Sequence, residues 1–255
     1  YKRQQRAGRA GYEWQRVRVG TTAATLLPAS NRCTNVIAAR RGGSTHFFVA
    51  LPNTGANGQI FETWDQGLSW KQVGTGYPSG KGRIALAVFL DQGTAANQDV
   101  IYAINDDGQV HRVERTLGVR GAWDAWNQVS GTPSNIEQQG DYNRGFAIAP
   151  DNKNRLYIGG AWVLSNGEYS GFLYRCNISG SGTSFSMATT FLGNSIHPDL
   201  HTLVFAQNDP RQLWVGCDGG VFYTSNALAT DNLDTLFRAC NDGLQTLQFN
   251  SVGQH

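Results

Sequence analysis

The sequence predicts an all-β protein assembled from repeated units of four short strands. One bulky aromatic residue, with a short tail such as Lys71-Gln72-Val73 after it, recurs at intervals of 56, 56, 59 and 52 residues. These marker aromatics are Trp14, Trp70, Trp126, Phe185 and Phe237. A fixed period in this range is typical of a chain that repeats one supersecondary element. No segment shows a convincing helical period, so the repeated element is expected to consist of strands.

Within each unit, four short apolar runs are separated by Gly, Asn, Asp or Pro. The first runs cover 35–39, 84–90, 145–149 and 202–206, and the second cover 48–50, 102–104, 157–159 and 214–216. The third runs include 60–61, 110–111, 173–174 and 222–223, and the fourth carry the marker aromatics. Runs that are short and rich in Val, Ile and aromatic residues are typical of strands, because such side chains suit a pleated, half-buried surface.

Four strands repeated at this period favour a β-propeller, in which four-stranded antiparallel blades pack around a channel. A stacked solenoid is the alternative, but its units are usually shorter. The expected blades are 21–75, 76–130, 131–190 and 191–240. Residues 1–20 would form a basic N-terminal arm and the last strand of a blade, and 246–255 the first strand of a further blade. About four and a half blades predict part of a larger ring, or five blades if the ring closes.

The turn before Trp70 carries a resemblance to a known family. Residues 63–70 read Thr-Trp-Asp-Gln-Gly-Leu-Ser-Trp and match the Asp-box pattern Ser/Thr-x-Asp-x-Gly-x-x-Trp. The chain therefore resembles the sialidase-type (BNR, Asp-box) repeat propellers. The residue types suit a structural turn built by Thr63, Asp65, Gly67 and Trp70: Asp65 accepts backbone N–H bonds, Gly67 supplies a positive φ, and Trp70 plugs the blade.

That resemblance implies a structural role for the turn rather than an active site. Sialidases also need an arginine cluster that a Phe/Tyr-Arg-Ile-Pro motif announces, whereas Arg83-Ile84 is followed here by Ala85. Sialidase activity is therefore not expected.

The last third of the chain carries a second resemblance. Residues 197–201, 203–205, 208–210, 213–216, 218–222 and 241–244 are similar to secreted bacterial proteins with sialidase-type repeats. More loosely, they resemble xyloglucanase-type glycoside hydrolases. These resemblances imply a secreted or cell-surface protein. A charged fraction of only 16%, together with 31 glycines, also suits a rigid β protein with many turns.

The charge distribution and the hydropathy of the sequence indicate whether nucleic acids or membranes are expected partners. Residues 1–20 hold six basic residues against one acid, which leaves 15 basic and 18 acidic residues elsewhere. Without an RNA-binding motif, this arm is expected to be a solvated extension, and nucleic-acid binding is not expected. No apolar stretch approaches the length of a membrane span. Because the chain starts at Tyr1, we expect a processed protein or a piece of a longer one.

The four cysteines, Cys33, Cys176, Cys217 and Cys240, lack the CxxC spacing of a zinc knuckle. Cys217 and Cys240 belong to the same unit and would be able to pair in an oxidising compartment. Alternatively, all four are buried as small apolar residues. The sequence leaves both interpretations open.

The most chemically suggestive segment is His197-Pro198-Asp199-Leu200-His201. If it is extended, His197, Asp199 and His201 share one face and form a candidate ligand site with Tyr142, or a site for a divalent metal. The segment leads into the first strand of its unit, where a propeller has its channel mouth. Asp141 precedes the neighbouring first strand at the same offset as Asp199. The simpler interpretation is that these side chains tie loops together by hydrogen bonds.

Two functions follow from this site. The sequence favours a non-catalytic extracellular scaffold that binds a glycan, a metal or a protein, or that contacts the remaining blades of its ring. The alternative, which the second resemblance implies, is a xyloglucanase-type glycoside hydrolase with Asp141 and Asp199 as its catalytic pair. Inverting hydrolysis needs two carboxyl groups roughly 6.5–9.5 Å apart. No cofactor beyond the possible metal is expected.

Overall fold

The computed structural model describes residues 2–5, 12–15, 27, 33–52, 59–78, 82–92, 98–115, 122–165, 167–206, 209–231 and 233–244. These residues form strands joined by turns, apart from the 3-10 turns η2 (Gly193–Ser195) and η3 (Leu233–Thr235). The predicted all-β class is therefore confirmed. Among these residues, no helix is long and apolar enough to cross a membrane. The chain divides into two compact units, the first comprising residues 1–130 and 180–186 and the second residues 131–179 and 187–255.

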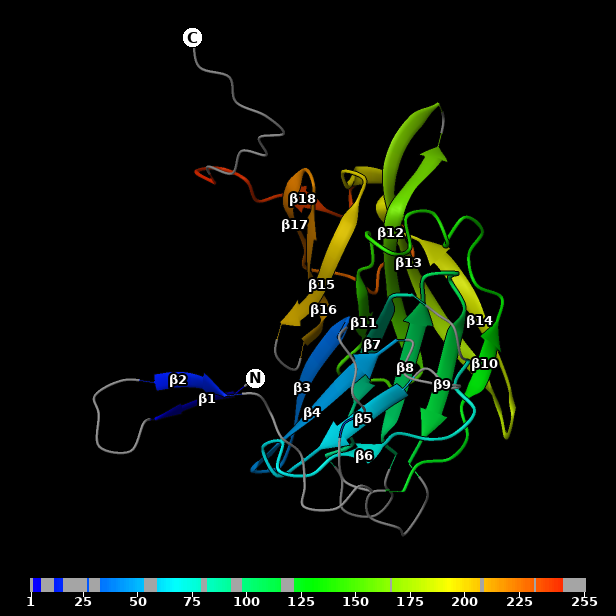
Figure 1. The fold of residues 1–255 in the computed structure, drawn as a ribbon. Helices are drawn as coiled ribbons and strands as arrows, with labels where there is room; N and C mark the ends of the chain where they lie inside the picture. The colour runs from blue at the N-terminus through cyan, green and yellow to red at the C-terminus, as the bar shows by residue number, and fades with distance from the viewer. Residues whose placement is uncertain are drawn as a thin grey trace. The chain divides into compact units, whose positions relative to one another are not determined.

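The first unit contains one antiparallel four-stranded sheet and four antiparallel strands that make up half of an eight-stranded sheet (Figure 1). The four-stranded sheet is β3 (Asn35–Arg41), β4 (Ser44–Leu51), β5 (Gln59–Thr63) and β6 (Lys71–Gln72). The other four strands are β7 (Ile84–Phe89), β8 (Val100–Asn105), β9 (Val110–Glu114) and β10 (Asn127–Ser130). An antiparallel pair, β1 (Lys2–Gln5) and β2 (Tyr12–Gln15), precedes them. Trp70 and Trp126 each stand directly before the fourth strand of a sheet.

The second unit contains most of the other four strands of the eight-stranded sheet and a second four-stranded sheet. Its strands are β11 (Phe146–Ile148), β12 (Arg155–Ser165), β13 (Glu168–Ser181) and β14 (Ser184–Phe191). Residues 180–186, which span the end of β13 and the start of β14, belong to the first unit, and there β14 pairs in parallel with β10. These strands are followed by β15 (Leu200–Ala206), β16 (Asp209–Cys217), β17 (Gly220–Thr224) and β18 (Arg238–Ala239). Asp218 and Gly219 form a two-residue hairpin turn, because Cys217 pairs with Gly220. Residues 246–255, expected to start a further blade, lie outside the described residues.

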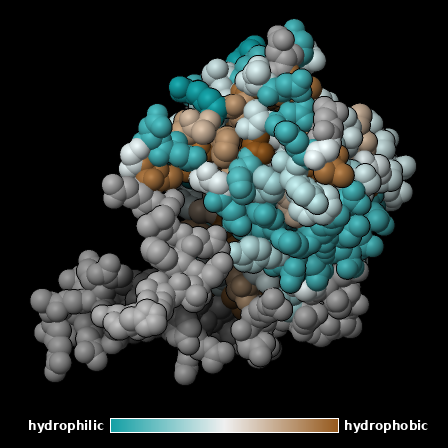
Figure 2. All heavy atoms as spheres, turned by 90° about the horizontal axis from the view of Figure 1, so that it is seen from above, coloured by the Kyte–Doolittle hydropathy of each residue, from teal (hydrophilic) through white to brown (hydrophobic). Residues whose placement is uncertain are grey.

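Each unit has its own apolar core between its two sheets. In the first unit, Phe48 and Ile60 pack with Ile84, Leu86 and Ile101 of the neighbouring sheet. The second unit has an equivalent core, and its main members are Tyr157, Leu173, Leu203, Leu213 and Val215. On the face shown in Figure 2, apolar side chains lie in small groups among hydrophilic ones. Antiparallel runs of four strands are thus observed, and two of these runs are joined into one eight-stranded sheet by the parallel pairing of β10 with β14. The division into blades around a channel stays a prediction.

The turn at residues 63–70 has the local geometry that its residues predict. Asp65 accepts a hydrogen bond from the Ser69 backbone N–H at 2.9 Å, and the Thr63 hydroxyl donates to Asp65 at 2.7 Å. Gly67 has φ 84°, and Gln66 before it has φ 61°. Trp70 is buried at the end of the turn. The polar residues therefore satisfy the turn internally and leave the indole to pack against the sheet.

Both interpretations of the cysteines are corrected by the structure. All four cysteines are free, so Cys217 and Cys240 do not form a disulfide. The reason is the strand register: Cys217 pairs with Gly220, whereas the Cys240 N–H donates to the carbonyl of Val221. Only Cys176 is buried, while Cys33 is exposed and the other two are half-buried. Burial raises the pKa of the Cys176 thiol to about 12.

A network of buried charges links the two sheets of the first unit, and the sequence did not indicate it. The Arg115 guanidinium bonds to Glu62 of β5 at 2.8 Å and to Asp99 at 2.6 Å. Arg41 of β3 also pairs with Asp99, and His46 of β4 contacts Glu62 at 2.9 Å. Both carboxylates are fully buried. Arg115 therefore balances two negative charges that have no access to water.

Candidate functional site

The structure brings the four predicted ligand-binding residues into one neighbourhood of the second unit. Tyr142, in the turn before β11, meets His201 of β15 edge to face, with ring centroids 5.1 Å apart. His201 Nε2 lies 2.7 Å from Oδ1 of Asp218 in the β16–β17 hairpin. The charges of His197 and His201 both act on Asp199. We call these residues, together with Asn143, the Tyr142–His201 cluster.

Asp199 is held by its main chain as well as by its side chain. Its N–H donates to the carbonyl of Ala161 at 2.7 Å, and its own carbonyl accepts from the Asp218 N–H at 3.2 Å. Its φ is 63°, a left-handed conformation that aspartate tolerates better than most residues with a side chain. Asn143, which is fully buried, donates from Nδ2 to Asp199 Oδ1. The carboxyl group is thus fixed in place before any ligand binds.

The left-handed Asp199 overturns the expectation that His197, Asp199 and His201 share one face. That expectation required an extended segment, whereas β15 begins only at Leu200. His197 instead lies against the hairpin turn, where a Cβ on Gly219 would come within 2.4 Å of it. Within the described ranges, no three His, Cys, Asp or Glu side chains are grouped so that they could hold a metal ion. The metal site inferred from the alternating spacing is therefore not formed.

The electrostatics of the cluster raise the pKa of Asp199. Burial raises the pKa of this carboxyl group, and the negative charge of Asp218 raises it further. The charges of the two histidines and the hydrogen bond from Asn143 oppose this effect without cancelling it. Asp199 therefore keeps its proton to a higher pH than an ordinary carboxyl group does.

The predicted partner of Asp199, Asp141, lies exposed in the turn that also carries Tyr142. Asn143 is the residue of this turn that donates to Asp199. Asp218 is a second carboxylate close enough to act on Asp199. The pairing of Asp141 with Asp199 in catalysis stays a prediction.

The sequence interpretation missed Asn143 and Asp218. Asp218 was detectable in principle, because the antiparallel register pairs Leu200 with Cys217 and so sets the residues on either side of that pair close together. Asn143 gave no such signal. Its contact with Asp199 joins residues 56 apart in the chain, from the segments that precede β11 and β15.

Comparison of the chain with family models, curated proteins and solved structures found no match. Functional assignment therefore depends on the geometry of the cluster and on the resemblance carried by the quoted residues.

We expect Asp199→Asn to increase the free energy of unfolding at pH 7 and to flatten its pH dependence. A raised pKa means that the folded state binds the Asp199 proton more tightly than the unfolded state. This contribution is complete below the unfolded pKa and is lost as the pH rises through the folded pKa. Asparagine carries no charge, tolerates the left-handed backbone and keeps an oxygen for Asn143. Urea unfolding between about pH 3 and pH 8 measures the effect.

Asp141→Asn is the matched control, since it removes an exposed carboxylate from a neighbouring turn. A profile for Asp199→Asn that follows the wild type across this range would contradict the assigned electrostatics.

Proposed function

We propose that the protein is a non-catalytic β-propeller of sialidase-type repeats, secreted or at the cell surface, that binds a glycan at the Tyr142–His201 cluster. The observation that carries the proposal is the exposed ring of Tyr142, 57% accessible, held against His201 beside oriented carboxyl and amide groups. Glycan recognition combines an apolar ring face with a few directed hydrogen-bonding groups. The cluster provides both on one surface.

The propeller part of the proposal is supported by the regular order of the strands. Each expected unit yields four antiparallel strands in chain order, with its marker aromatic in or directly before the fourth strand. In both units, the first strand of one sheet contacts the first strand of the next, β3 with β7 and β11 with β15. Repetition of this contact would arrange such sheets radially.

A binding role agrees with the way the carboxyl groups are engaged. Asp199 already accepts from Asn143, and Asp218 is already paired with His201. Groups fixed in this way suit the orientation of a ligand, because little side-chain entropy is lost on binding.

The hydrolase alternative keeps one favourable observation, the raised pKa of Asp199. A carboxyl group with a raised pKa suits a general acid, and Asp141 would then serve as the base. Release of reducing sugar from β-glucans by the wild type, lost in both Asp199→Asn and Asp141→Asn, would establish this function. It would also exclude the non-catalytic proposal.

Replacing Tyr142 by alanine is expected to weaken glycan binding by at least about tenfold, as for an aromatic hot spot. Affinity electrophoresis in gels containing xyloglucan or mixed-linkage β-glucan measures the change. Tyr169→Ala is the matched control, because Tyr169 is also an exposed tyrosine of this unit but lies outside the cluster. Equal retardation of Tyr142→Ala and the wild type would reject the proposed site, as would a wild type that no glycan retards.

A further inference from the structure

The second strand of each four-strand run carries one large aromatic residue at the same position of the repeat. These residues are Phe48, Tyr102, Tyr157 and Trp214. The first three are 0% exposed, whereas Trp214 is 40% exposed. Val204, which pairs with Trp214 from the first strand, is 54% exposed. A position that the repeat otherwise buries is therefore open on this face of β15–β18, which we call the Trp214 face.

In both units, the next four-strand run along the chain covers the aromatic residue of the run before it. Phe48 of β4 packs in one core with Leu86 of β7. Tyr157 of β12 meets Phe205 of β15 edge to face, with ring centroids 5.0 Å apart. Accordingly, β4 contacts β7, and β12 contacts β15. The second strand of one run thus packs against the first strand of the next, and a contact of this kind would close the open position at Trp214.

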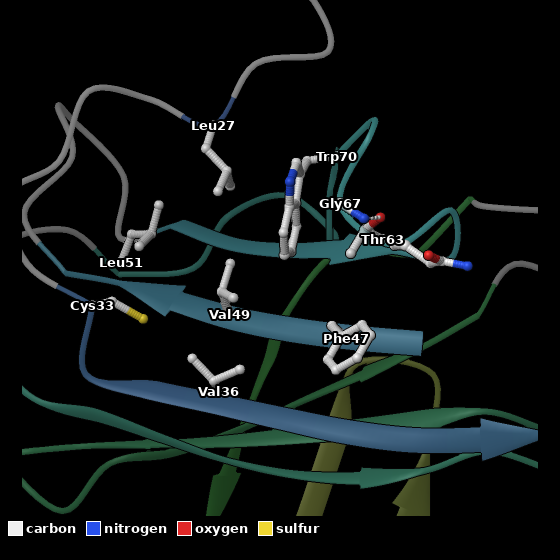
Figure 3. A pocket seen from close by; sticks show the side chains of 10 residues that line it. Leu27, Cys33, Val36, Phe47, Val49, Leu51, Thr63, Gly67 and Trp70 are labelled. Carbon is white, nitrogen blue, oxygen red and sulfur yellow. Dashed lines mark hydrogen bonds between the residues drawn. The ribbon is translucent and has the colours of Figure 1, made fainter. Parts of the chain in front are cut away.

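The first unit contains a first strand whose corresponding face is open. Val36 of β3 is 60% exposed, whereas Leu86 of β7 and Leu203 of β15, at the same repeat position, are 1% and 7% exposed. This β3–β4 face is hollowed into a pocket of about 460 Å3 with an almost wholly apolar lining, where Val36 and Val49 lie on the strands and Trp70 stands beside them (Figure 3). Such a surface gains free energy when an apolar partner covers it.

Trp70 gives the pocket the wall that a second-strand aromatic residue meets elsewhere in the chain. In both cores, that residue shares its cluster with the marker aromatic of the next run. The two pairs are Phe48 with Trp126 and Tyr157 with Phe237. The marker aromatic at the pocket is Trp70. By the same relation, the pocket is a seat for a large aromatic side chain from another run.

Trp70 also adds a polar observation. Its side chain is buried, and its indole N–H has no acceptor among the residues that the structure describes. A buried donor without a partner lowers stability. Trp126, one repeat further on, donates its indole N–H at 2.8 Å to the carbonyl of Val73, the third residue after Trp70. A marker indole is thus satisfied by the run that precedes it.

The third residue after a marker recurs at this contact. Val129 is the third residue after Trp126, and it pairs in parallel with the next marker, Phe185. The third residue after Phe237, the last marker, is Cys240. Cys240 directly follows β18, so the sheet that carries the Trp214 face also has a carbonyl group at this repeat position.

We propose that the Trp214 face of one copy of the chain packs on the β3–β4 face of a second copy. Trp214 then enters the pocket beside Trp70, and the Cys240 carbonyl accepts the Trp70 indole N–H. A second copy is the occupant that the observations favour, because both faces belong to this chain and their mode of packing occurs within each unit. The contact joins unlike faces, so every copy has one face of each kind to offer. It does not depend on glycan binding at the Tyr142–His201 cluster.

Sedimentation velocity of the full chain over a wide range of concentration tests the contact, and the wild type is expected to associate reversibly. Trp214→Lys and Val36→Lys each place a charge on one face and are expected to weaken association at least about tenfold, as at an interface hot spot. Both side chains are exposed in the single copy, so both variants are expected to fold. Leu164→Lys is the matched control, because Leu164 is 58% exposed but lies on β12, outside both faces.

Mixing the two variants distinguishes a contact between unlike faces from other modes of association. Trp214→Lys keeps an intact β3–β4 face, and Val36→Lys keeps an intact Trp214 face. The mixture is therefore expected to associate at concentrations where neither variant does so alone. A wild type that stays monomeric, association that either substitution leaves intact, or a mixture that does not associate overturns the proposal.

Hydrogen exchange of the indole groups, followed by NMR with labelled tryptophan, tests the polar part of the contact. Trp70→Phe and Trp126→Phe identify the two resonances. Exchange of the Trp70 indole N–H is expected to slow at least roughly tenfold as the wild type associates, while that of Trp126 stays constant. Val36→Lys should abolish this dependence on concentration. Protection of Trp70 that is already complete in the monomer would place its acceptor in the same copy and overturn the assignment.

Discussion

Replacing Arg115 by alanine is expected to lower the free energy of unfolding by about 3–5 kcal/mol. Arg115 lies between Glu62 and Asp99, at 2.8 Å and 2.6 Å, and both carboxylates are fully buried. Its removal leaves two buried negative charges with only part of their compensation. Chemical denaturation followed by far-ultraviolet circular dichroism measures the loss. Arg155→Ala, which breaks a partly exposed pair with Asp151, is the control and is expected to cost less than about 1 kcal/mol.

The same substitution should alter the response to acid. Burial alone would raise the pKa of Glu62, but the hydrogen bonds from His46 and Arg115 lower it overall. A lowered pKa stabilises the fold above the unfolded pKa, and this stability is lost as the pH falls through the folded pKa. The difference between the wild type and Arg115→Ala should therefore shrink on acidification. A difference that is constant with pH, or a loss no larger than that of Arg155→Ala, would contradict the role assigned to the network.

Trp126→Ala is expected to lower the free energy of unfolding by about 3–5 kcal/mol, because it empties a core position and removes a hydrogen bond. The ring is buried, meets Tyr77 edge to face at 5.2 Å, and donates to the Val73 carbonyl. Gly74 lies so close that a Cβ there would be 2.9 Å from the indole. This fit leaves little room for other side chains to fill the space.

Trp126→Phe separates the two contributions, since it keeps an aromatic ring but leaves the Val73 carbonyl without its donor. Its expected cost from the hydrogen bond is about 1–2 kcal/mol. Trp214→Ala is the control, because this indole is 40% exposed and should cost clearly less. The denaturant midpoint measures the loss of stability in all three variants, provided that the dependence of the free energy of unfolding on denaturant concentration is unchanged. A loss for Trp126→Ala as small as that for Trp214→Ala would show that the marker aromatic does not organise its sheet.

Strand positions could be predicted from the sequence because they depend on residues that are neighbours in the chain. The run 84–90 became β7 (Ile84–Phe89), since branched and small apolar side chains there favour an extended backbone. The turn at 63–70 was equally local: Asp65 and Thr63 bond within the turn, and Gly67 takes the positive φ. The same holds for the hairpin at Asp218 and Gly219.

The sequence predicted which residues form the candidate site but not how they are oriented. Tyr142, His197, Asp199 and His201 were identified by residue type and by their place before a first strand, and they do lie together. Their relative orientation was wrong, because the assumption of an extended segment failed at Asp199. That residue takes a left-handed φ while its main chain bonds to Ala161 and Asp218, which no local pattern indicates.

Residue types and their spacing were thus sufficient for the all-β class, the four-strand units and the turns, since each depends on contacts within a few residues. Folding in three dimensions was needed for the ion network of Arg115, Glu62 and Asp99, for the unpaired cysteines and for the bond between Asn143 and Asp199. These features depend on how segments far apart in the chain pack together, and a one-residue change of strand register would alter them. Such distances follow from packing, which short sequence patterns do not encode.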